Sequence, residues 1–253
     1  MRRDAVMRPI TLAITGHRLA HPSLLGRAAA ADCALETLFD LLAASPLARR
    51  GFSLNTMLAD GADQMAARQA LTLGWPLKAI LPFGAALTCA IGAAKPRDGA
   101  ERRRALLAET QRVIGSHTES ANAPVQAFVD LLRRAQVEAS PEHDQDFAAS
   151  WIEGARSFSD EASQRYALAA QSASKEADLL VAVWDGASTD QIGGTGHTVV
   201  AALKIAKPVI WIEPAAPETA RLLHSVSNLR PASAPIGNVV AAFTQELQDS
   251  EHG

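Results

Sequence analysis

The stretch ADLLVAVWDG, residues 177–186, decides the fold class of this chain. Residues 179–184 form an unbroken apolar run, as expected of a strand that is covered on both faces of a parallel sheet. The run ends at Asp185 and is followed by the glycine-rich stretch GGTGHT, residues 193–198, and then by apolar residues at helical spacing. A buried strand, a glycine-rich loop and a helix in this order are typical of an α/β fold.

Four further apolar runs predict strands at residues 9–15, 52–59, 77–81 and 208–212. Helical patterns lie between the first three of these runs. Strands that alternate with helices and are too apolar to face water indicate a Rossmann-like, doubly wound parallel sheet. We predict about five strands in the order 3-2-1-4-5, with the switch point between the first and the fourth strand.

Residues 84–160 break this regular pattern and show no strong strand. We interpret them as a helical insertion after the third strand, within a single domain that spans residues 1–253. Such an insertion could be a lid, a dimerisation arm or a mobile excursion. Its helices are expected around residues 101–114, 125–137 and 147–158, and one or two covering helices are expected beyond residue 213.

Composition excludes several classes of function. The net charge of −3 over 253 residues argues against a general duplex-DNA binder, which needs a basic face. Cys33 and Cys89 lie far apart without CxxC spacing, so we expect reduced thiols, a cytoplasmic location and no structural zinc site. No stretch approaches the length needed to cross a bilayer. Nothing in the chain indicates a cofactor or a metal ion.

Ligands of open parallel sheets bind outside the carboxyl ends of the strands. Polar residues and glycines follow the predicted strands, so they should gather at this one edge. We predict that the ligand site is formed by Gly16, His17, Arg18, Asp60, Gly61, Asp63, Pro82, Asp185, Gly193, Gly194, Thr195, Gly196, His197 and Thr198.

The glycine-rich run carries the sharpest signal for a phosphate. Its glycines allow a tight turn and a close approach to a ligand, and free amides at the start of the next helix favour an anion. Thr195 and Thr198 could add hydroxyl donors. The alternative is a mobile glycine loop with a capping threonine and no ligand. The run is neither a Walker A loop nor a dinucleotide fingerprint, because no Gly-Lys-Ser/Thr follows it and the first loop lacks GxGxxG.

The charged candidates each have two interpretations. Arg18 could clamp a phosphate or form a surface ion pair, and His17 could donate to the ligand or pack beneath its loop. Asp60 and Asp63 could bind ribose hydroxyls or cap the helix that follows them. Asp185 could contact ribose or act as a base, or simply form an Asp-Gly turn.

His197, at a helix start, is expected as a neutral imidazole that hydrogen-bonds a ligand. Trp151 could stack on a base if the insertion folds over the site. The remaining histidines show no convergent pattern and are interpreted as surface or loop residues: His21, His117, His143, His224 and His252.

Together these motifs resemble the SLOG superfamily, which includes the Lonely Guy enzymes, DprA and many prokaryotic nucleotide-sensor domains. The resemblance is strongest to the bacterial sensor-type branch. It rests on TGHR, ADGAD, LPF, ADLLVAVWDG, GGT and KPVI at residues 15–18, 59–63, 81–83, 177–186, 193–195 and 207–210.

The resemblance implies a cytoplasmic binding or sensor domain for a nucleotide, an ADP-ribose-like or NAD-derived compound, or a cyclic nucleotide. It also implies a homo-oligomer, expected as a dimer, and the response of a sensor would come from this oligomerisation or from a separate effector protein. Lonely Guy enzymes carry a catalytic glutamate in GGxGTxxE, where this chain has Val199. The alternative is therefore a nucleotide N-glycosidase or phosphoribohydrolase that uses Asp185, with His197 assisting the leaving base. DNA binding of the DprA type is disfavoured by the charge.

Overall fold

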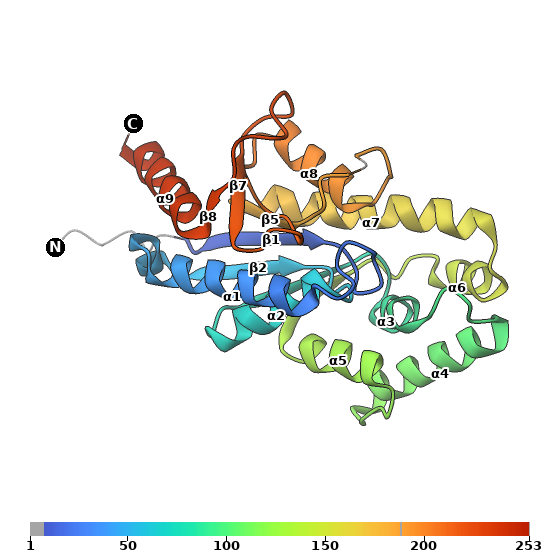
Figure 1. The fold of residues 1–253 in the computed structure, drawn as a ribbon. Coiled ribbons are helices and arrows are strands. Elements are labelled where there is room, and N and C mark those ends of the chain that lie inside the picture. Colours follow the sequence, from blue (N-terminus) through green and yellow to red (C-terminus); the bar gives the residue numbers. More distant parts are fainter. Residues whose placement is uncertain (1–7, 188, 253) are drawn as a thin grey trace.

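The computed structural model describes residues 8–187 and 189–252, and it is built around one sheet (Figure 1). The five strands at the centre of this sheet run parallel in the order β3-β2-β1-β5-β6, which is the predicted 3-2-1-4-5 arrangement. The α/β, Rossmann-like fold class is thereby confirmed. The bounds of these strands are β1 (Ile10–Gly16), β2 (Phe52–Thr56), β3 (Leu77–Leu81), β5 (Leu179–Val183) and β6 (Val209–Ile212).

The prediction of about five strands was too low, because the described residues form eight. β4 (Ala135–Ala139) pairs parallel to β3 at one edge. The helix expected around 125–137 is present as α5 (Ala123–Leu132), but it ends earlier than expected, and its last three expected residues belong to β4. At the other edge, β7 (Thr219–Leu223) pairs antiparallel to β6, and β8 (Ala234–Pro235) pairs antiparallel to β7. The three additional strands lie outside the central five. β4 and β8 are the edge strands with one hydrogen-bonded neighbour each, and β7 lies between β6 and β8. None of the three has the continuous apolar run of a central parallel strand.

Helices cover both faces of the sheet (Figure 1). One face carries α1 (Ala28–Ala44), α2 (Ala62–Thr72) and α9 (Ile236–His252), and the other carries α7 (Arg156–Glu176) and α8 (Thr195–Lys204).

Alternate side chains of β5 pack against the helices on these two faces. Leu179, Val181 and Val183 join the core cluster that contains α1 and α2, whereas Leu180 and Ala182 join the cluster that contains α7 and α8. Side chains of a strand alternate in direction, so a strand covered on both sides must be apolar throughout. This burial explains why the run at residues 179–184 is unbroken.

The segment 84–160 is more than a helical insertion. It contains α3 (Ala85–Ala93), α4 (Ala100–Ser116), α5 (Ala123–Leu132) and α6 (Asp144–Glu153) in addition to β4. The helix expected at 147–158 is divided at Gly154, whose φ of 74° ends α6 before α7 begins. Trp151 is buried among the core residues and does not line the cavity described below, so it has no face for stacking on a base there.

Within the described residues, no helix has the length and apolar character that crossing a bilayer requires.

The loops after β1 and β2 touch through their backbones. Gly61 has a φ of 96°, and a Cβ atom there would lie 2.4 Å from the carbonyl oxygen of His17. The N–H of Ala62 donates to that same carbonyl at 3.3 Å. This contact fixes the loop after β1 against the start of α2.

We predict that Gly61→Ala lowers the free energy of unfolding by about 2–4 kcal/mol, because the side chain adds both a clash and a strained φ. Gly92→Ala in α3 is the matched control, since a Cβ atom there meets nothing within 4 Å. That change should leave stability unchanged or raise it by about 0.5–1 kcal/mol. Urea unfolding of the two variants measures the difference, and equal effects would contradict the close backbone contact.

Candidate functional site

A cavity of about 500 Å³ lies at the carboxyl ends of β1 and β5, where the connections of the two strands leave toward opposite faces of the sheet. This is the expected position of a ligand in an open parallel sheet. Its walls come from the loop after β1, the start of α8 and one side of α7. Nine of the predicted site residues line it: Gly16, His17, Arg18, Asp63, Asp185, Gly193, Gly194, Thr195 and Gly196.

The glycine-rich loop presents the first turn of α8 to this cavity. Gly193 has a φ of 75°, and a Cβ atom there would lie 2.5 Å from the carbonyl oxygen of Ser163, so the loop backbone packs directly on α7. The N-cap residue is Gly194, which has no side chain to accept hydrogen bonds from the first amides of the helix. These amides are therefore open to an anion or to water.

The remaining predicted residues lie outside the cavity. Thr198 is buried, and its hydroxyl donates to the carbonyl of Gly194 at 3.1 Å. His197 lines a separate groove between α7 and α8, and Pro82 lines a hollow near β4. Gly61 supports the loop after β1 rather than the cavity surface, and Asp60 pairs with Arg18 at its margin, with 3.7 Å between carboxylate oxygen and Nε.

Arg18 is held by α7. Its Nη2 atom donates to the Tyr166 hydroxyl at 3.2 Å, and the guanidinium carbon lies 5.5 Å from the centre of the Tyr166 ring. The Asp60 carboxylate approaches from the opposite loop. Arg18 thus forms an ion pair and also lines the cavity, so its two predicted roles coexist in one position.

Asp63 lines the cavity and is buried. One carboxylate oxygen accepts hydrogen bonds from the Thr56 hydroxyl at 3.2 Å and from the Met57 N–H at 3.1 Å. Burial raises the pKa of Asp63 to about 7, although these hydrogen bonds oppose the shift. The helix α2 is capped at Gly61 without a side-chain hydrogen bond, so neither Asp60 nor Asp63 acts as its N-cap.

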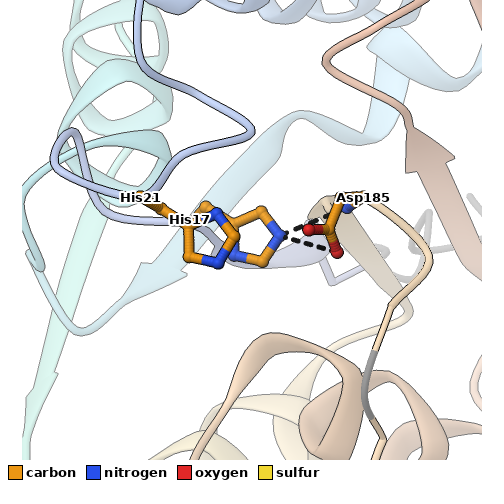
Figure 2. Close-up of side chains that lie close together, drawn as sticks. All are labelled: His17, His21 and Asp185. Atoms are coloured by element: carbon orange, nitrogen blue, oxygen red, sulfur yellow. Dashed lines mark hydrogen bonds and ion pairs between the residues drawn. The ribbon is translucent and has the colours of Figure 1, made fainter.

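His17 and Asp185 both line the cavity, and their side chains point toward each other (Figure 2). Nε2 of His17 lies 3.1 Å from Oδ1 of Asp185 and 3.2 Å from its backbone nitrogen. Burial, followed by the nearby His21, lowers the pKa of His17, while Asp185 opposes that shift. Burial favours a protonated Asp185, but the Ala187 N–H and His17 together outweigh it and hold the pKa of Asp185 below its ordinary value.

His21 was interpreted as a surface or loop residue, and that interpretation is incomplete. Its ring lies parallel to the His17 ring, with 3.7 Å between centroids and 2° between planes (Figure 2). The two histidines are four residues apart in an irregular loop, where spacing alone predicts no geometry. Other cavity residues that the sequence reasoning missed are Thr15, Ala20, Met57, Ala59, Ala162, Ser163, Tyr166, Trp184, Ala187, Gln191 and Ile192.

No known protein-family model matches this sequence, and no curated protein matches it either. The resemblance to the SLOG superfamily therefore stays a prediction.

The buried carboxyl of Asp63 gives a prediction about pH. The unfolded chain loses this proton near the ordinary pKa of 3.8, whereas the folded chain loses it at about 7. Between these values the folded state holds a proton that the unfolded state has lost, so the contribution of Asp63 to stability falls as the pH rises from about 4 to about 7. Above that range the contribution stays low.

The lowered pKa of His17 makes the stability of the folded chain rise with pH over part of the same range, which opposes the effect of Asp63. Comparing the wild type with Asp63→Asn isolates the contribution of Asp63, because His17 is present in both proteins. The free energy of unfolding of the variant relative to the wild type should increase between pH 4 and 7, by at most about 4 kcal/mol. Urea unfolding at several pH values measures this difference. A difference that does not change with pH would show that Asp63 is ionised throughout.

Proposed function

We propose that this chain is a cytoplasmic binding or sensor domain for a nucleotide or a nucleotide-derived ligand, such as ADP-ribose, an NAD-derived compound or a cyclic nucleotide. The observation that carries the proposal is the uncapped first turn of α8, which lines the same cavity of about 500 Å³ as Arg18. That volume lies within the range of small-molecule sites, about 300–1,000 Å³.

The phosphate would bind at the start of α8. The amides of Thr195 and Gly196 lie at the positive end of the helix dipole, and Gly194 leaves room for an oxygen to approach them. Arg18 adds a planar cation with several donors. Its contacts with Tyr166 and Asp60 hold this group in position without burying it, since its side chain is 42% exposed.

The nucleoside would occupy the rest of the cavity. The ionised carboxylate of Asp185, a quarter exposed, is suited to accept hydrogen bonds from ribose hydroxyls. Met57 and Ala162 contribute apolar surface, and Tyr166 and Trp184 contribute aromatic surface. A mostly apolar wall with few polar groups is typical of small-molecule sites.

Binding is better supported than cleavage of an N-glycosidic bond. Val199, at the position of the Lonely Guy glutamate, is fully buried, and His197 lies outside the cavity, away from any leaving base. Among the described residues, Asp63 and Asp185 are the carboxylates that line the cavity. Asp63 is buried and already hydrogen-bonded, so a reaction would depend on Asp185 alone. A sensor would also need an output, for which we propose homodimerisation or a separate effector protein.

A thermal-shift screen against nucleotides, cyclic nucleotides, NAD and ADP-ribose tests binding. A ligand at a hundred times its dissociation constant should add about 2.7 kcal/mol of stability and raise the melting temperature. Arg18→Ala should remove about 1.5–3 kcal/mol of binding free energy, and Gly194→Asp should abolish binding by placing a negative charge at the phosphate position. Arg68→Ala, an exposed arginine on α2, is the matched control and should bind as the wild type does. A panel without a single shift would contradict the proposal.

The same panel separates binding from catalysis when the products are analysed by chromatography. The proposal predicts that no free base is released. Release that Asp185→Asn abolishes would instead establish the N-glycosidase alternative.

A further inference from the structure

Three metal-ligand side chains converge in the wall of the cavity. His17 and His21 come from the loop after β1, and Asp185 follows β5 (Figure 2). One potential ligand atom from each of them lies within 4.8 Å of the other two. All three side chains are partly exposed and line the cavity, so a cation could reach them.

Nε2 of His17 lies between two groups of Asp185. When Nε2 carries no proton, it accepts a hydrogen bond from the Asp185 N–H at 3.2 Å, while the Asp185 Oδ1 lies 3.1 Å away. A cation bound by both Nε2 and Oδ1 would use the lone pair that otherwise accepts from this N–H, and it would replace a contact between two electron-rich atoms.

His21 has a partner that can orient it as a ligand. Its Nδ1 atom lies 2.7 Å from the Ser23 hydroxyl. When Nδ1 donates to this oxygen, the lone pair of Nε2 is available to a metal ion. A metal-bound histidine usually donates its other ring N–H to a polar partner in this way. The Ser23 N–H at 3.3 Å from Nδ1 would suit the opposite tautomer, but this contact is longer.

We propose that His17, His21 and Asp185 form a binding site for a divalent transition-metal ion of the Zn²⁺ type. Two imidazoles and a carboxylate are a ligand set that suits Zn²⁺ and its neighbours and leaves coordination positions open. Ligand atoms of a tetrahedral zinc site lie about 3.3 Å apart, given bond lengths of about 2.0–2.1 Å. The cluster must therefore contract, and the half-buried His21 side chain lies on an irregular loop that can supply this movement. The open positions would face the cavity and take water or oxygen atoms of a ligand.

The test uses the full chain, stripped with a chelator and free of nucleotide. Calorimetric titration with Zn²⁺ alone, and the visible absorption of Co²⁺ alone, should report one site per chain. His21→Asn should lower the affinity at least ten-fold, and Ser23→Ala should lower it by about ten-fold through loss of the orienting contact. His117→Asn, at the exposed end of α4, removes an imidazole outside the cluster and should bind as the wild type does.

A wild-type chain that binds neither ion at micromolar concentration overturns the proposal, and so does His21→Asn with unchanged affinity. Should His21→Asn fail to fold, Asp185→Asn provides the second variant, with the same expected loss. Because no nucleotide is present, failure of metal binding leaves the nucleotide proposal standing, and a failed nucleotide screen leaves this one standing.

Discussion

The parallel pairing of β1 with β5 is the constraint on which the rest of the structure depends. Their register pairs Gly16 with Val183, and the N–H of His17 extends the ladder by donating to the carbonyl of Val183 at 3.1 Å. Both strands therefore end at the same level. Because the chain then leaves toward α1 on one face and α8 on the other, the two loops diverge and leave a cavity between them.

Close backbone packing then holds the loops that line this cavity in position. A Cβ atom at Gly16 would lie 2.3 Å from the Cβ atom of Ala62, and Gly61 and Gly193 are just as tightly enclosed. The contacts of Gly16 and Gly61 hold the loop after β1 against the start of α2, and the contact of Gly193 holds the glycine-rich loop against α7. The side chains that remain, Arg18 and Asp185 among them, are free to face the cavity.

The sequence predicted the central part of the fold because buried parallel strands require continuous apolar runs. It failed at the edges: β4 reads AQVEA and is largely exposed, so nothing in its sequence separates it from the end of a helix. The site prediction was most successful for the loops that directly follow β1 and β5. The carboxyl ends of neighbouring parallel strands lie at the same edge of the sheet, so the topology alone brings these loops together. The prediction missed Tyr166, which reaches the cavity from the middle of α7, and His21, whose position depends on an irregular loop.

The most direct test of the account is a titration of the isotope-labelled chain with ADP-ribose, followed through its backbone amide resonances. The account predicts that the largest shifts fall on Gly194, Thr195 and Gly196 and on the loop from His17 to His21, while the edge strand β4, three strands away from β1, is unaffected. Shifts that cluster away from the carboxyl ends of β1 and β5, or none at millimolar ligand, would contradict it.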